Sequence, residues 1–270
     1  SQNTLYVVKI INDNLIVYYN VSFDNNLNYT LQRQGTGFTK KSIAEMYTGT
    51  WCGICPGTLI PLENYINTHP KTFFIAIHGP NGSNDPYTYV YDAQLRAAFN
   101  ISGVPTVVLN RDTKWANPND TSTLNQLTIG KTSTGISIET SINGSLVNVI
   151  SKVKFDSTIS QPLKLAIALV EDSMAFNQAN YGHFGLPNPI ANYCHRNALR
   201  KMATDILGDA IPLASTTAGN VYQSTFSINA SGYNLSKCRI IAYVVYANSS
   251  PKKGVLNAQQ VTVGQNQNFD

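Results

Sequence analysis

Charged residues are scarce in this chain. They make up 13% of its 270 residues, about half the usual share of roughly 25%. The net charge of +4 is dispersed, with no Lys/Arg run or basic face, which leaves nucleic-acid binding without support. A hydrophobic fraction of 43% is enough for packed cores, and Asn, Thr, Ser, Gly and Tyr replace the missing charges. This composition is typical of an exported protein with β-rich parts.

Long apolar runs and a leader are also missing. No apolar run reaches the roughly 18 residues that a membrane-spanning helix needs. The sequence shows no signal peptide and starts at Ser1 rather than Met, so we expect a processed or trimmed chain. The missing leader is therefore no argument for a cytosolic protein.

Cysteine is rare as well, but two of the four cysteines are separated by only two residues. An apolar run over residues 43–47 predicts a strand, and the helical spacing of apolar residues after Pro56 predicts a helix. Cys52 then falls at the helix N-terminus, where the helix dipole favours a thiolate. Cys55 lies one turn further on, close enough to close a disulfide or to resolve a mixed one. We therefore expect a redox-active dithiol.

The pair has two alternative interpretations, a structural disulfide and a zinc site. An inert structural disulfide gains little stability, because the loop that it closes is so short. Zinc ligation needs two more ligands at motif spacing, and Cys194 and Cys238 are far away and unpatterned. No metal and no cofactor are expected.

Two motifs resemble the active site of thioredoxins. Trp51 directly precedes Cys52, which gives Trp-Cys-Gly-Ile-Cys. Further on, Gly103-Val104-Pro105-Thr106 follows a predicted helix and precedes a predicted strand. The resemblance implies that Val104–Pro105 is a cis peptide bond and that Trp51, Val104 and Pro105 bind the backbone of a partner.

The order of predicted elements supports an α/β thioredoxin-like domain over residues 38–130. The predicted strands are 43–47, 72–78 and 106–110, and the predicted helices begin at Pro56 and cover 87–100 and 120–127. Residues 1–37 form a β arm, with strands at 5–11 and 15–21 and a further one at 28–32. We expect this arm to augment a neighbouring sheet or to be the remnant of a trimmed preceding module.

After residue 130 the pattern changes to runs of period two. Strands are predicted at 136–142, 146–155, 163–170, 221–228, 239–246 and 255–263. The pair Asn143-Gly144 predicts a hairpin turn. Six strands at this spacing indicate an all-β, sandwich-like domain over residues 131–270. One embedded helix is predicted over residues 193–207, ended by Gly208.

The chain also resembles the twenty-eight-kilodalton outer-membrane-protein family of Bacteroidetes (Omp28-related proteins). The resemblance covers roughly residues 41–263. It is carried by the Cys-x-x-Cys segment 47–56, by 75–78, 103–106 and 110–111, and by 169–172, 195, 199–200 and 255–259. It implies an exported protein, often a lipoprotein, located in the periplasm, in the outer membrane or at the cell surface, with a thioredoxin-like domain and a β-domain. Cys194 beside His195 departs from the pattern.

Four further residues are candidates for supporting roles. His78 ends a central strand at the edge that carries the dithiol, where it favours the thiolate or is an ordinary solvated histidine. The resemblance to thioredoxins implies that Glu45, one residue off in spacing, lies near the place of a buried acid that assists proton transfer to the second cysteine, with an edge-strand carboxylate as the alternative. Cys194 and Cys238 are expected to form a structural disulfide, because leftover cysteines of exported proteins are commonly joined.

The function that follows is thiol–disulfide exchange with protein thiols or disulfides, in which Cys52 attacks and Cys55 resolves. A lipid anchor upstream of the chain is the expected membrane link. The alternative is a non-catalytic surface or periplasmic binding protein that uses the thioredoxin fold as a scaffold, since a fold does not fix a function.

Overall fold

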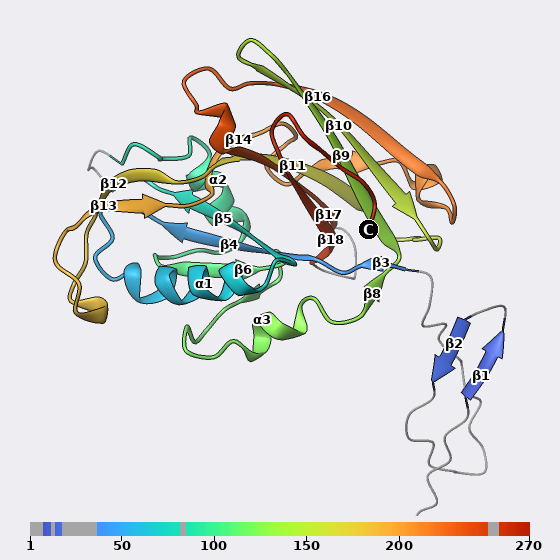
Figure 1. The fold of residues 1–270 in the computed structure, drawn as a ribbon, viewed down its shortest axis with the longest axis horizontal. Helices are drawn as coiled ribbons and strands as arrows, with labels where there is room; N and C mark the ends of the chain where they lie inside the picture. Colours follow the sequence, from blue (N-terminus) through green and yellow to red (C-terminus); the bar gives the residue numbers. More distant parts are fainter. Residues whose placement is uncertain (1–7, 12–13, 18–36, 82–84, 248–253) are drawn as a thin grey trace, which may run out of the picture.

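One β-sheet runs through most of the molecule in the computed structural model, which describes residues 8–11, 14–17, 37–81, 85–247 and 254–270 (Figure 1). Its strands lie in the order β18 (Val255–Thr262), β17 (Cys238–Tyr246), β11 (Leu163–Glu171), β14 (Ala198–Met202), β5 (Thr72–His78), β4 (Ser42–Thr48), β6 (Thr106–Leu109) and β7 (Thr113–Lys114), and β15 (Asp209–Ile211) also pairs with β11. The sheet thus crosses the expected boundary at residue 130. The division into two domains stays a prediction.

The predicted strands of the first half are present. β4 pairs in parallel with β5 and antiparallel with β6. All residues of β4 and β5 are buried, as their near-continuous apolar runs predicted. Both faces of this part of the sheet are therefore covered.

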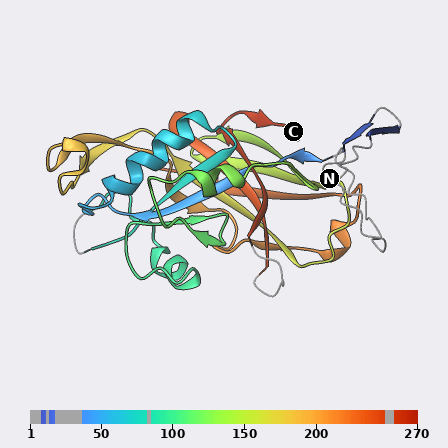
Figure 2. The ribbon, with the colours of Figure 1, turned by 90° about the horizontal axis from the view of Figure 1, so that it is seen from below.

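Helices cover the two faces (Figure 2). α1 (Pro56–Thr68) buries Leu59, Leu62 and Tyr65 against one face, as predicted. α2 (Asp92–Ala98) lies on the other face and is shorter than the predicted helix. The residues before it form turns and an isolated bridge to the end of β5 instead, where the Tyr89 amide donates to the carbonyl of His78 at 2.8 Å. α3 (Ser122–Gln126) lies within the predicted range. No helix formed by the described residues is long and apolar enough to span a membrane.

A second sheet packs on the other half of the large one. Its order is β16 (Val221–Asn229), β10 (Leu146–Phe155), β9 (Thr134–Asn143) and β19 (Asn266–Gln267). Alternate residues of β10 point into a core shared with β11 and β17. The predicted hairpin turn between β9 and β10 is confirmed, with Gly144 at φ +59°, a conformation that suits glycine. All six period-two runs are strands, which confirms the β-rich second half.

The embedded helix predicted over residues 193–207 is wrong. That segment contains the end of β13 (Ile190–His195), a turn in which Asn197 has φ +48°, and β14. β14 is inserted between β11 and β5, so strand pairing on both sides outweighs its helical propensity. Gly208, expected as a helix end, lies in a turn at φ +89°.

The remaining strands of the described residues form three small sheets. β12 (Met174–Gln178) pairs with β13, β3 (Phe38–Thr39) pairs with β8 (Lys131–Thr132), and β1 (Val8–Ile11) pairs with β2 (Asn14–Val17). Short 3-10 helices are η1 (His183–Gly185), η2 (Leu213–Thr216) and η3 (Leu235–Lys237). β1 and β2 form a sheet of their own, which does not support the expectation that the arm augments a neighbouring sheet. The predicted strand at 28–32 lies outside the described residues.

A buried ion pair lies on one face of the large sheet, beside β4. The Arg111 guanidinium makes three hydrogen bonds of 2.9–3.1 Å to the Glu45 carboxylate, and a fourth of 3.0 Å to the carbonyl of Ile206. Both side chains are almost fully buried, at 3% and 1% exposed. Arg111 also lies over the ring of Tyr243, 4.9 Å from its centroid. β4 is an inner strand, so the reading of Glu45 as an edge-strand carboxylate is wrong.

We predict that Arg111→Met lowers the free energy of unfolding by about 3–5 kcal/mol, because it leaves the Glu45 charge buried without a partner. The double variant Glu45→Leu/Arg111→Met should recover much of that loss. Urea unfolding followed by tryptophan fluorescence measures both. Lys152→Met is the matched control: its pair with Glu139 is partly exposed on both sides, so its loss should cost less than about 1 kcal/mol. An equal cost for the two single variants would contradict this view of the pair.

Candidate functional site

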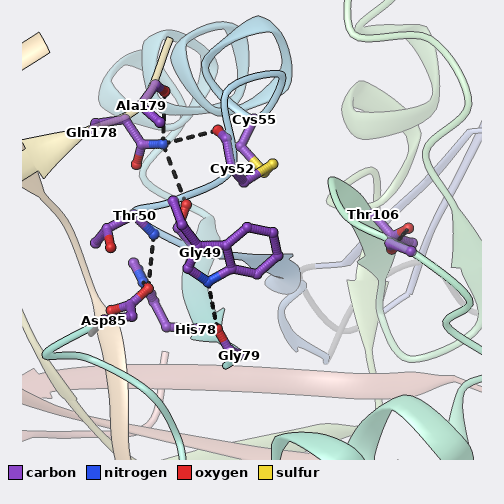
Figure 3. Close-up of a disulfide and its surroundings, with 12 residues drawn as sticks. Gly49, Thr50, Cys52, Cys55, His78, Gly79, Asp85, Thr106, Gln178 and Ala179 are labelled. Atoms are coloured by element: carbon purple, nitrogen blue, oxygen red, sulfur yellow. Dashed lines mark hydrogen bonds and ion pairs between the residues drawn. A yellow bond between two sulfur atoms is a disulfide. The ribbon is translucent and has the colours of Figure 1, made fainter. Parts of the chain in front are cut away.

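The two motif cysteines form a disulfide at the N-terminal end of α1 (Figure 3). Their Cα atoms are 5.3 Å apart. β4 ends at Thr48, a turn follows, and Cys55 is the N-cap residue of the helix. The turn is closed by the Cys52 amide donating to the carbonyl of Gly49 at 3.0 Å and by the Cys55 amide donating to the carbonyl of Cys52 at 3.1 Å. The predicted strand–dithiol–helix unit is confirmed.

Trp51 is fixed on the side of the turn that faces β5. Its indole Nε1 donates to the carbonyl of Gly79 at 2.9 Å (Figure 3). The same ring lies so close to Gly49 that a Cβ at that position would collide with it. Gly49 is therefore required by the close approach of the indole rather than by its backbone angles.

The predicted cis peptide bond between Val104 and Pro105 is present. Val104 packs against the hydrophobic cluster that contains Cys52 and Cys55. The segment around Val104 therefore packs near the dithiol, as the resemblance implied.

His78 is not a solvated loop histidine, since only 2% of the residue is exposed. Its Nδ1 lies 2.9 Å from Oδ2 of Asp85. The same carboxylate accepts from the backbone amides of Thr50 at 2.7 Å and Tyr87 at 2.9 Å. Burial by itself raises the pKa of Asp85, but the bonds from His78 and the two amides outweigh it and lower that pKa below its usual value. His78 thus reaches the dithiol turn through Asp85 and Thr50.

No sequence pattern predicted a role for Asp85. It lies in a Gly/Pro/Asn-rich segment, where a single acid carries no pattern. Its three hydrogen bonds make it the link between the end of β5 and the turn before Cys52.

Glu45 lies on the wrong face for proton transfer to Cys55. Ile43 and Tyr47, which share its side of β4, pack in the cluster around α2, whereas Ala44 and Met46 pack in the cluster with the two cysteines. Side chains alternate across a strand, so the sheet separates the Glu45 carboxylate from the dithiol. Its partner is Arg111 instead, which corrects the expected role.

The β12–β13 hairpin, from the second half of the chain, covers the dithiol turn. The Gln178 amide Nε2 donates to the carbonyls of Cys52 at 3.0 Å and Gly49 at 3.3 Å (Figure 3). The Ala179 amide donates to the carbonyl of Thr50 at 2.8 Å, and the Tyr181 amide to that of Gly53 at 2.7 Å. These bonds run along the turn as a neighbouring strand would. No pattern in the sequence predicted this contact between the hairpin and the dithiol turn.

Side chains of the hairpin also dock on the helix. The Tyr193 hydroxyl donates to Oε2 of Glu63 in α1 at 2.7 Å. Burial raises the pKa of Glu63 to about 7, although the bond from Tyr193 opposes the shift. Directly after β13, Arg196 donates to the amide oxygen of Asn67 at 2.7 Å. The hairpin is therefore attached along α1 as well as at the turn.

The predicted disulfide between Cys194 and Cys238 is wrong, because both are free. Cys194 is exposed on β13. Cys238 lies in the core between the two large sheets, where burial raises the pKa of its thiol to about 12. A thiol on the surface of the hairpin and a thiol inside the core cannot meet.

His195 gives the hairpin a pH-dependent stability. Only 2% of it is exposed, and its ring lies 5.5 Å from that of His78 and 5.0 Å from that of Tyr87. Burial first, and then the nearby His78, lower the pKa of His195 from 6.5 to about 4. Between these values the unfolded chain binds a proton that the folded chain does not, so stability falls as the pH falls.

We predict that this residue alone removes about 2 kcal/mol of the free energy of unfolding between pH 7 and pH 5. His195→Gln should lose that part of the pH dependence, as urea unfolding at both pH values would show. Comparing variant with wild type cancels the opposite contribution of Glu63. His69→Gln, at the exposed end of α1, is the control and should keep the wild-type dependence. An unchanged pH dependence in His195→Gln would refute the role of His195.

Comparison with known proteins gives a neighbour in fold and a family. Among solved structures, HBP35 of Porphyromonas gingivalis is similar with a TM-score of 0.70 and 20% sequence identity, over 85% of this chain and 77% of that one. At this identity the likeness shows the fold alone. The β-glucosidase 3B of Thermotoga neapolitana in complex with glucose, at 12% identity over 53% of this chain and 17% of that one, has a TM-score of only 0.23. A TM-score of that size is too low to indicate a shared fold. No curated protein matches.

The family match is more informative. A family model described as outer membrane protein Omp28 matches residues 92–267. It includes the Val104–Pro105 segment and the β12–β13 hairpin, but it begins after the Cys-x-x-Cys segment, which carried most of the resemblance seen in the sequence. An outer membrane family indicates a location in the cell envelope or at the surface. Because the match spans more than half of the chain, this protein belongs to the Omp28 outer membrane protein family.

Proposed function

We propose that the protein is an exported thiol–disulfide oxidoreductase whose residues 38–130 form a thioredoxin-like domain. One observation carries the proposal: the Cys52–Cys55 disulfide lies at the N-terminal end of α1, directly after β4. The partial positive charge of a helix N-terminus stabilises a thiolate. Cys52 lies in the turn before the helix and Cys55 caps it, so both sulfurs lie near this end of the helix, and we assign the attacking role to Cys52.

The exchange proceeds in two balanced steps. The Cys52 thiolate attacks one sulfur of a substrate disulfide, and the other substrate sulfur leaves as a thiolate that takes up a proton. Cys55 then loses its proton and attacks Sγ of Cys52, which releases the second substrate thiol and forms the Cys52–Cys55 disulfide. Two electrons pass from the dithiol to the substrate. The reverse sequence oxidises a substrate dithiol.

The surroundings of the disulfide support a protein substrate. Trp51 and Val104 flank the cluster that contains both cysteines, and Ile54, between the two cysteines, is half exposed. Trp51, Val104 and Pro105 are the residues that we assign to binding the partner's backbone. His78 supports the turn through Asp85 rather than by contact with sulfur.

We also propose a finer location than the family match gives. In this proposal the protein works in the periplasm or on the outer membrane, with a lipid anchor upstream of the chain as its membrane link. Disulfide chemistry is favoured in such oxidising compartments.

A non-catalytic binding protein is the second candidate, and burial of the cysteines favours it. Cys52 is 4% exposed and Cys55 is fully buried, whereas a reacting sulfur has to be reached by its partner. In that case the disulfide is structural and the fold serves as a scaffold.

Reactivity of the reduced protein separates the two candidates. We predict that, near neutral pH and with limiting iodoacetamide, Cys52 is alkylated before Cys55, and that Cys55→Ser traps a mixed disulfide with insulin while Cys52→Ser does not. Mass spectrometry of tryptic peptides identifies the modified sulfur. All variants carry Cys194→Ser, because the exposed Cys194 thiol would react as well. Equally slow labelling of both cysteines, with no trapped partner, would establish the structural disulfide instead.

A further inference from the structure

Gln178 lies far from the dithiol in the sequence and next to it in the structure. No part of Gln178 is exposed. Its Nε2 donates to three carbonyls, those of Cys52 at 3.0 Å, of Ala179 at 3.1 Å and of Gly49 at 3.3 Å. Two of these belong to the turn that carries Cys52. A buried amide with several carbonyl partners fixes the position of the chains that it joins.

The segment that follows Gln178 is closed by its own hydrogen bonds. Asn180 is fully buried, and its Nδ2 donates to the carbonyls of Leu186 at 2.9 Å and His183 at 3.2 Å, while its Oδ1 accepts from the His183 amide at 3.1 Å. This closes residues 178–186 into a compact loop, which we call the strap.

The strap and the dithiol helix fit one another through two glycines. A Cβ at Gly53 would collide with the ring of Tyr181, and a Cβ at Gly57 would lie 2.7 Å from the ring of His183. Tyr181 and His183 therefore occupy space that only glycine leaves free. The Ala179 and Tyr181 amides also bond to the carbonyls of Thr50 and Gly53. The strap therefore contacts the chain before, between and after the two cysteines.

We propose that Gln178 is a positioning residue for thiol–disulfide exchange: it keeps the Cys52 turn in place when the disulfide opens, so that Cys55 stays within reach of Cys52. The inference rests on the proposed function. When a substrate sulfur is bonded to Cys52, resolution requires the Cys55 thiolate to return to Sγ of Cys52. A turn held by the strap keeps the two sulfurs at a high effective concentration. A released turn lets the mixed disulfide persist.

The test is the lifetime of a mixed disulfide with glutathione. Reduced protein with Cys194→Ser is mixed with oxidised glutathione, quenched with acid at intervals, and analysed by intact-mass spectrometry for the dithiol, the glutathione adduct and the disulfide. We expect Gln178→Met to slow resolution of the adduct by about tenfold, the change that corresponds to the loss of about 1.4 kcal/mol from one net hydrogen bond. The adduct should then accumulate in the variant and stay transient in the parent.

Gln259→Met is the matched control. Gln259 is also buried, at 3% exposed, and its Nε2 donates to the carbonyl of Asn268 and to the Asp270 carboxylate. It lies on β18, away from the dithiol. Its loss should lower the melting temperature without changing the lifetime of the adduct. Gln178→Glu, which keeps the length of the side chain but cannot donate as a carboxylate, provides a second variant and should slow resolution in the same direction.

The outcomes separate this inference from the proposed function. If the parent forms the adduct and resolves it, and folded Gln178→Met or Gln178→Glu resolves it equally fast, the positioning role is overturned while exchange stands. If Gln259→Met slows resolution as much as Gln178→Met, the effect is one of general stability and the role is also overturned. If the parent never forms an adduct, the proposed function fails and the inference fails with it.

Discussion

The pairing of β14 with β5 is the contact on which the arrangement of the site depends. The Ala76 amide of β5 donates to the carbonyl of Asn197 at 2.9 Å, and Ala198 pairs with Ala76 in parallel register. β14 thereby joins strands from the second half of the chain to β5 and β4. Only two residues separate the end of β13 from the start of β14. This single pairing therefore also fixes the end of the β12–β13 hairpin.

The consequences extend to the dithiol. β14 begins opposite the C-terminal part of β5, so His195 at the end of β13 stands beside His78 at the end of β5, with ring centroids 5.5 Å apart. From there the hairpin runs along α1, where Tyr193 bonds to Glu63, and reaches the turn through Gln178. A strand pairing in the sheet is thus connected to the Cys52 turn by buried polar contacts. The second half of the chain is part of the site, although it contributes no sulfur to it.

Much of this fold was predictable from local pattern. Runs of period two revealed six strands of the second half, Asn143-Gly144 marked a hairpin, and Cys52, Cys55, Val104 and Pro105 marked the site. Local pattern failed where long-range pairing decides the outcome. Residues 193–207 read as a helix, but β14 gains two strand partners in the sheet. Glu45 lies one residue away from a motif position in sequence, and alternation along β4 turns it toward Arg111. Asp85 and Gln178 were missed because isolated polar residues acquire their roles only from neighbours distant in sequence.

The reduction potential of the Cys52–Cys55 pair tests the central claim, that this disulfide is a working redox centre, most directly. It is measured by equilibrating the protein in graded mixtures of reduced and oxidised dithiothreitol or glutathione and counting free thiols by mass after alkylation. Dithiols of exchange proteins have potentials of about −270 to −120 mV, whereas structural disulfides usually lie below about −300 mV. We predict a value in the first range, reached without unfolding. A potential below about −300 mV, or reduction only when the protein unfolds, would contradict a redox role for the pair.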